Sequence, residues 1–193
     1  DAEKLKADAV CLPGHKGLLG PSGTGLLLLS GKNLPRPLLF GGTGIESRPV
    51  TMPDLPPERY EAGTQNLVGI AGLLEGIRFV SKNQREIWEH EKKLAARLVG
   101  HLSGMPNVEV FAPKTGPETG VVSFRSPLID CESWNDRLSA KGFALRAGLH
   151  CAPLAHETAG TLETGTLRAS PGPFNTERHI DRLAEALFDT LTE

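Results

Sequence analysis

The sequence is poor in cysteine, in long apolar runs and in net charge. Its three cysteines are widely spaced, so they cannot form a disulfide framework, and a reducing, cytoplasmic setting fits them best. The longest apolar run, residues 26–29, is far shorter than the roughly 20 residues that cross a bilayer, and no secretory-type apolar stretch follows the first residues. A formal net charge of −2 provides no basic face for nucleic acid. We therefore expect neither membrane nor nucleic-acid partners.

The composition and length fit a globular protein. Of the 193 residues, 39% are hydrophobic and 23% are charged, which allows one domain or parts of two. The chain has no starting methionine, and residues 1–10 resemble the interior of a protein. We therefore expect a further segment before residue 1.

The first third of the sequence predicts strands and a long loop. Residues 9–12 form an apolar run that ends at a Pro-Gly pair, and residues 26–29 form a second run after a glycine-rich turn, so both are predicted as buried strands. Residues 31–60 are dense in glycine and proline. A loop of this length in a compact protein is either functional or disordered, and its apolar residues favour a functional loop.

The remainder predicts helices and short strands. Apolar spacing predicts helices over residues 66–80 and 84–102, with Gly69, Gly72 and Gly76 along a separate face of the first. Thr176 is the predicted N-cap of a last helix, residues 176–191. Between these helices, strands are predicted at 108–111, 120–124, 144–147 and 166–169, and a short helix at 133–141. The pattern indicates two modules: residues 1–80, part of an α/β domain, and residues 84–193, an α+β domain with a mixed or antiparallel sheet.

Lys16 is the first candidate for chemistry. It follows an apolar strand and lies in a glycine-rich turn, where the backbone can approach a ligand closely. Lysine forms Schiff bases when its surroundings favour the neutral amine. The same pattern also suits a surface lysine in a hairpin turn. Residues 20–25 suggest a phosphate loop but lack the Walker pattern.

Cys151 is the second candidate, because basic residues surround it. Arg146, His150 and His156 all lie within five positions of it. Neighbouring cations favour the thiolate, which is the nucleophilic form of cysteine. The alternative is a buried structural cysteine.

The other two cysteines and a metal site are weaker candidates. Cys11, in its apolar run, is predicted to be a buried structural residue, and Cys131, at a helix start, is predicted to be exposed and has no basic neighbours. A zinc site built from Cys151, His150 and His156 would lack both paired ligand spacing and a fourth ligand. No metal is therefore expected.

Arg168 is the third candidate. It lies in the middle of a predicted strand between Leu167 and Ala169, so its guanidinium should be partly buried and in need of an anion. Two hydrogen bonds to a substrate carboxylate would satisfy it, and so would an internal salt bridge. The spacing leaves both possibilities open.

Taken in order, these motifs resemble the class V aminotransferase-fold enzymes that use pyridoxal 5'-phosphate (PLP), and within them the group II cysteine desulfurases and selenocysteine lyases. The resemblance covers nearly the whole chain. The motifs that carry it are Gly14-His15-Lys16, the glycines at 20, 23 and 25, the pair at 41–42, and residues 59–66, 146–152, 167–170 and 174–176. The resemblance implies an α/β protein of the PLP-dependent transferase fold (type I). Residues 1–80 would be the C-terminal part of its large PLP-binding domain, and residues 84–193 its small C-terminal α+β domain.

The resemblance also implies which residues bind the cofactor. Lys16 would hold PLP as a Schiff base, and His15 would lie against the cofactor. Gly63 and Thr64 would reach the phosphate of the neighbouring subunit's PLP, so a homodimer is expected. Enzymes of this type carry a serine where this chain has Pro13, which cannot donate a hydrogen bond to the phosphate.

Substrate roles are implied in the same way. Arg168, with Arg146 near it, would bind the carboxylate of L-cysteine or selenocysteine. Cys151 would take the sulfur as a persulfide, leaving alanine, and pass it to an acceptor protein, as in iron–sulfur cluster assembly. His150 would influence the protonation of that step.

Several points stay open. The ring that stacks on PLP and the aspartate that pairs with its pyridine nitrogen are not in this sequence, so we expect activity to require the preceding segment. Selenocysteine lyases share the same motifs. A class V aminotransferase is a further alternative, although it has no need of Cys151. The alternative outside catalysis is a sulfur-relay or dimerisation module without cofactor.

Overall fold

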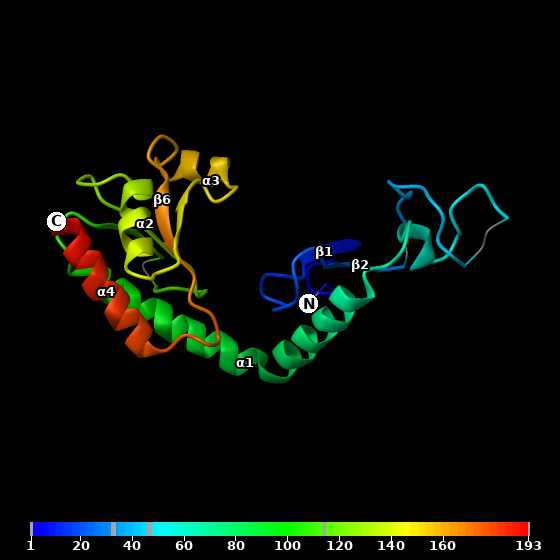
Figure 1. Cartoon of the computed structure of the whole chain (residues 1–193), viewed down its shortest axis with the longest axis horizontal. Coiled ribbons are helices and arrows are strands. Elements are labelled where there is room, and N and C mark those ends of the chain that lie inside the picture. Colours follow the sequence, from blue (N-terminus) through cyan, green and yellow to red (C-terminus); the bar gives the residue numbers. More distant parts are fainter. Residues whose placement is uncertain (1, 32–33, 46–47, 114, 193) are drawn as a thin grey trace. The chain divides into compact units, whose positions relative to one another are not determined.

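The computed structural model describes residues 2–31, 34–45, 48–113 and 115–192 of the chain (Figure 1). Two compact units are present, Asp1–Asn83 (unit 1) and Gln84–Glu193 (unit 2). Unit 1 contains β1 (Ala9–Pro13), β2 (Gly25–Leu29), the 3-10 helix η1 (Glu58–Tyr60) and the start of α1 (Leu67–Ser103). Unit 2 contains the rest of α1 and then β3 (Glu109–Phe111), β4 (Val122–Arg125), α2 (Cys131–Ala140), β5 (Arg146–Gly148), α3 (Pro153–Thr158), β6 (Thr166–Ala169) and α4 (Glu177–Thr192). No helix within the described ranges is long and apolar enough to span a lipid bilayer.

In unit 1, β1 and β2 form an antiparallel hairpin in which Ala9 pairs with Leu29 and Pro13 with Gly25. The sequence predicts both strands, but its prediction that they are buried is wrong within this chain. The side chain of Leu28 is 46% exposed, for example. A two-stranded sheet has two faces to cover, and the described residues of unit 1 cover them only in part.

The two helices predicted over residues 66–80 and 84–102 both lie in α1. Asn83, between them, leaves the helical conformation with φ −119° and ψ 17°. In the unit 1 part of α1, Gly69 and Gly76 are buried, whereas Leu67 is 73% exposed. The glycine face of the helix, together with Leu73 at 4% exposure, therefore makes contacts within unit 1, whereas the start of the apolar stripe is exposed.

The long loop predicted over residues 31–60 contains η1 near its end. Tyr60 Oη donates a hydrogen bond to Pro35 O at 2.8 Å, and Gly63 N donates to Gly42 O at 2.8 Å. These bonds tie the segment before α1 back to the loop. The functional role expected for the loop stays a prediction.

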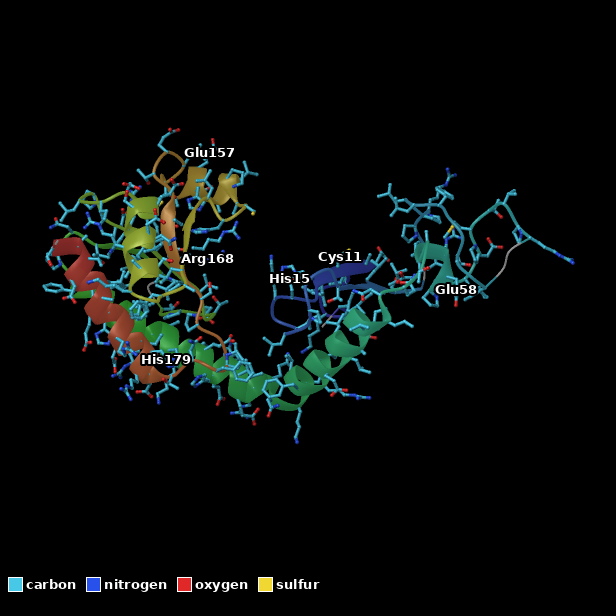
Figure 2. All side chains as sticks on the ribbon, viewed as in Figure 1. Cys11, His15, Glu58, Glu157, Arg168 and His179 are labelled. Atoms are coloured by element: carbon cyan, nitrogen blue, oxygen red, sulfur yellow. The ribbon has the colours of Figure 1, made fainter. Side chains whose placement is uncertain are left out.

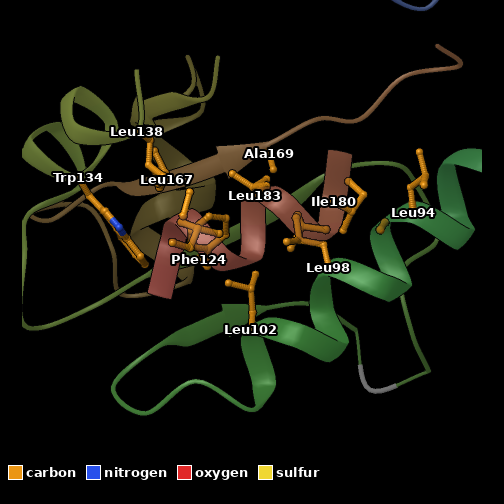
Figure 3. Close-up of a cluster of buried hydrophobic side chains, with 14 of the residues drawn as sticks. Leu94, Leu98, Leu102, Phe124, Trp134, Leu138, Leu167, Ala169, Ile180 and Leu183 are labelled. Carbon is orange, nitrogen blue, oxygen red and sulfur yellow. The ribbon is translucent and has the colours of Figure 1, made fainter. Parts of the chain in front are cut away.

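Unit 2 is built on a four-stranded antiparallel sheet with the order β3-β4-β6-β5. Of the two arrangements that the sequence allowed, mixed or antiparallel, the antiparallel one is present. Apolar side chains from α1, α2 and α4 pack with the sheet in one core (Figure 3). Its fully buried members include Leu94, Leu98, Leu102, Val122, Phe124, Trp134, Leu138, Leu167 and Leu187. Phe124 and Trp134 meet edge to face, with ring centroids 5.5 Å apart.

Polar contacts fix the helix ends in unit 2. Asp130 Oδ1 accepts a hydrogen bond from Ser133 N at 2.8 Å and caps α2. Thr176 Oγ1 accepts from His179 N at 3.4 Å, which confirms the predicted cap of α4. The predicted strand at 166–169 matches β6, whereas β5 lies two residues later at its start than predicted, and α3 is not predicted at all. Strand ends and single-turn helices are the parts that periodicity resolves least well.

Candidate functional site

Lys16 lies in the turn between β1 and β2, which we call the lysine turn (residues 14–24). Gly14 N donates to Thr24 O at 2.8 Å, and Gly20 N donates to Gly14 O at 2.8 Å, so backbone hydrogen bonds close the base of the turn. His15 and Lys16 are both exposed (His15 is labelled in Figure 2). Among the described residues, no side chain pairs with Nζ of Lys16. The amine is therefore available to a ligand.

The glycine face of α1 supports the lysine turn. A side chain at Gly72 would approach Pro21 Cγ at 2.8 Å. A side chain at Gly76 would collide with Leu18 O and lie 3.0 Å from Leu19 C, both of which are backbone atoms. Helix and turn are thus in close backbone contact, which only glycine permits. The sequence placed these glycines on one face of the helix but did not identify what they contact.

Gly63 and Thr64 lie just before α1. Gly63 has a φ of 89°, a conformation that suits glycine. Asn66 Oδ1 accepts a hydrogen bond from Gly69 N at 3.0 Å and so caps the helix. Thr64 is exposed beside this cap, and a hydroxyl next to a helix N-terminus suits a phosphate. The predicted role of Thr64 involves a second subunit and stays a prediction.

The structure reverses the predictions made for two of the cysteines. Cys11, predicted to be buried, is exposed, because the β1–β2 hairpin is only partly covered. Cys131, predicted to be exposed, is 8% exposed, because the first turn of α2 packs into the core of unit 2. Its Sγ lies 3.2 Å from Thr164 O, to which the thiol donates. Neither burial state could be read from neighbours in the sequence, since each depends on a distant layer.

In unit 2, Arg146 and Arg168 lie directly opposite each other on β5 and β6 (Arg168 is labelled in Figure 2). Their strand neighbours Ala147 and Leu167 belong to the core side of the sheet, so the two arginines share its other face. Like charges in this position repel each other. Nε of Arg168 is buried without a hydrogen-bond partner, and among the described residues Arg168 makes no salt bridge. An anion would relieve both the repulsion and the unpaired donor, so this face suits a carboxylate.

Cys151 is exposed and lies beside Arg146. Nη2 of Arg146 donates to Sγ of Cys151 at 3.5 Å. The backbone makes this contact possible, because Gly148, His150 and Cys151 have φ values of 99°, 53° and 60°. The left-handed conformation costs residues other than glycine of order 1–3 kcal/mol. The chain therefore turns back sharply after β5 and brings the thiol to a guanidinium five residues before it.

His150 is partly buried between these groups. Its pKa is lowered from the ordinary value, first by burial and then by the positive charge of Arg168. Its Nε2 lies 3.1 Å from Thr166 Oγ1, and its Nδ1 is buried without a partner. Both causes favour the neutral imidazole. His150 is therefore a poor source of positive charge for the neighbouring thiol.

His156, the other histidine near Cys151 in the sequence, is only 7% exposed. Its Nδ1 lies 2.8 Å from Thr161 Oγ1, and its ring centroid is 5.5 Å from that of His150. Within the described ranges, no group of three or more His, Cys, Asp or Glu residues could hold a metal ion. Thr161 and Thr166, which contact the two rings, were not predicted from the sequence. Strand alternation alone could have indicated Thr166, because it lies two residues from Arg168 on the same face of β6.

Comparisons of the sequence with known proteins all lead to the same family. A model of the class V aminotransferase family matches residues 1–183. The chain is 34% identical over 191 residues to a probable cysteine desulfurase of Pyrococcus abyssi, covering 94% of this chain and 46% of the relative. It is 31% identical over 196 residues to a probable cysteine desulfurase of Staphylococcus epidermidis, covering 98% of this chain and 46% of the relative. The chain thus spans about half the length of the curated relatives it matches.

Solved structures agree with the sequence relatives. The cysteine desulfurase CsdA from Escherichia coli superposes with a TM-score of 0.84 at 28% identity, covering 100% of this chain and 48% of that one. A cysteine desulfurase from Thermococcus onnurineus NA1 superposes with a TM-score of 0.85 at 29% identity, covering 99% of this chain and 48% of that one. The predicted fold class is confirmed: the chain has the α/β fold of these enzymes and corresponds to about half of it.

Proposed function

Because the chain belongs to the class V aminotransferase family, we propose that the protein containing it is a PLP-dependent cysteine desulfurase. It would convert L-cysteine to L-alanine and hold the sulfur as a persulfide on Cys151. The cytoplasm is the proposed location, in keeping with three free cysteines.

One observation carries this proposal. An exposed thiol, Cys151, contacts the guanidinium of Arg146, and Arg146 lies opposite Arg168, whose buried Nε lacks a partner. A nucleophilic sulfur and an unfilled carboxylate site thus adjoin on the same part of unit 2. A substrate with both a carboxylate and a sulfur atom, such as L-cysteine, matches this pair of groups.

The donor groups of unit 1 fit PLP. Lys16 offers an exposed amine without a described partner, as the cofactor's aldehyde requires. His15 would lie against the cofactor, while Gly63 and Thr64 would contact the phosphate of the neighbouring subunit's cofactor in a homodimer. When bound, PLP supplies an electron sink for negative charge on the substrate carbon. The residues that stack on the ring and pair with its nitrogen would come from outside this chain.

The roles of the chain's own residues follow from their chemistry. Arg168 binds the substrate carboxylate and so orients the substrate sulfur. The Cys151 thiolate donates an electron pair to that sulfur: the S–S bond forms, the C–S bond breaks, and the carbon retains its electron pair. Lys16 Nζ would move protons at the substrate α-carbon, and a proton added to the β-carbon that lost the sulfur completes the methyl group of alanine. An acceptor protein then removes the sulfur from Cys151.

The test uses the full-length protein with bound cofactor. We expect a violet-region absorbance that borohydride abolishes by fixing the cofactor to Lys16, together with alanine production and a persulfide on Cys151. Lys16→Ala should lack the borohydride-sensitive absorbance in the violet region. Cys151→Ala should abolish the persulfide and alanine production, whereas the matched variant Cys11→Ala should retain both. Alanine production at the full rate in Cys151→Ala would contradict the proposal and favour a lyase or an aminotransferase.

A further inference from the structure

We propose that Arg146 is a positioning residue for the sulfur of Cys151, and that Arg168 alone holds the substrate carboxylate. This inference deepens the proposed desulfurase function and rests on it. It departs from the substrate-binding role that the family resemblance implies for Arg146.

The two guanidinium groups have different surroundings although they are direct neighbours across β5 and β6. Arg168 is half-buried, and its Nε has no hydrogen-bond partner. Arg146 is exposed, and its Nη2 already has a partner in Sγ of Cys151 at 3.5 Å. An unpaired buried donor indicates a site for an external anion, whereas a donor in contact with the thiol indicates a local role.

The backbone after β5 supports the local role. Gly148, His150 and Cys151 all have left-handed φ values, so the chain reverses within four residues. Burial and the charge of Arg168 lower the pKa of His150, so this imidazole does not serve as the charged partner of the thiol. Arg146 is therefore the cation whose contact with Sγ the reversal creates.

A guanidinium suits both states of the sulfur. It stays charged at all relevant pH values and presents several donors in a planar fork. An S–S bond is about 2 Å long, so the terminal anionic sulfur of a persulfide would remain within reach of the same fork. Arg146 can thus hold the thiolate before the transfer and the persulfide after it.

The first test measures the thiol without substrate or turnover. Full-length protein, with and without added PLP, is treated with iodoacetamide at neutral pH, and alkylation of Cys151 is followed by peptide mass spectrometry. Arg146→Gln should slow alkylation of Cys151 by about tenfold, the size expected for loss of one charge-assisted hydrogen bond at an exposed site. Arg146→Lys should restore part of the rate. Arg178→Gln, an exposed arginine on α4, is the matched control and should leave it unchanged.

The second test separates the two arginines by kinetics. Arg168→Lys should mainly raise KM for L-cysteine, whereas Arg146→Gln should lower kcat and the yield of persulfide in a single turnover while KM stays near the wild-type value. Near-UV circular dichroism of each variant checks that the fold is retained. Wild-type alkylation in Arg146→Gln, or a KM increase matching that of Arg168→Lys, would overturn the inference. Lack of turnover in the wild-type protein would refute the proposed function instead, and the alkylation result would still decide the role of Arg146.

Discussion

Replacing Gly76 by alanine tests how the lysine turn is held. Alanine stabilises an exposed helix position by about 1 kcal/mol relative to glycine. At Gly76, however, the new methyl group would collide with Leu18 O and lie 3.0 Å from Leu19 C. These are backbone atoms, so no side-chain rotation can relieve the contact, and overpacking of this kind costs about 1–3 kcal/mol. We therefore expect a net destabilisation of up to about 2 kcal/mol for Gly76→Ala, with displacement of the lysine turn.

Gly100→Ala is the matched control, because it is the same substitution in the same helix, and apart from its own stretch of helix no described atom lies within 4 Å of the added carbon. It should stabilise the protein by about 0.5–1 kcal/mol. Urea unfolding measures both changes, and peptide-resolved hydrogen exchange locates them. Exchange should rise in residues 14–24 only in Gly76→Ala, and cofactor binding through Lys16 should weaken with it. Equal stabilisation by the two substitutions would refute the close contact between α1 and the lysine turn.

Two further predictions concern titrating groups. Hydrogen bonds from Arg97 and His101 lower the pKa of Asp181 from 3.8 to about 2, so its stabilising contribution is complete above pH 3.8 and is lost as the pH falls through about 2. We therefore expect the stability of Asp181→Asn, followed by tryptophan fluorescence during acid unfolding, to depend less on pH in this range. An unchanged pH dependence would contradict the hydrogen bonds of Arg97 and His101 to Asp181. The pKa of His150 should rise in Arg168→Gln but remain below its ordinary value, because burial is the larger cause of its lowering. NMR titration of the imidazole measures this change. An unchanged pKa would mean that the two side chains do not interact.

The sequence predicted local elements well where one pattern dominates. The cap at Thr176 and strand β6 are confirmed because capping and strand alternation act over a few residues. Burial was harder to predict. Cys11 and Cys131 were assigned the wrong way round, because their exposure depends on which layers cover β1 and the start of α2.

The candidate site shows the same limit. The sequence identified Arg146, Cys151 and Arg168 as candidates from residue type and spacing, and the structure brings all three into one part of unit 2. The sequence could not show that β5 pairs with β6, and this pairing places the two arginines opposite each other. Nor could it predict the left-handed backbone at His150 and Cys151, which only the assembled loop reveals.

The pairing of β5 with β6 also limits how the segment before it can vary. Adding or deleting one residue between α2 and β5 without a compensating bulge would rotate Arg146 to the side of the sheet where Ala147 now packs. A guanidinium would then be forced among apolar side chains, and the thiol would lose its neighbour, although every residue involved would still be present. At the exposed positions Lys141 and Ala144, the connecting segment should thus tolerate changes in residue type far better than changes in length.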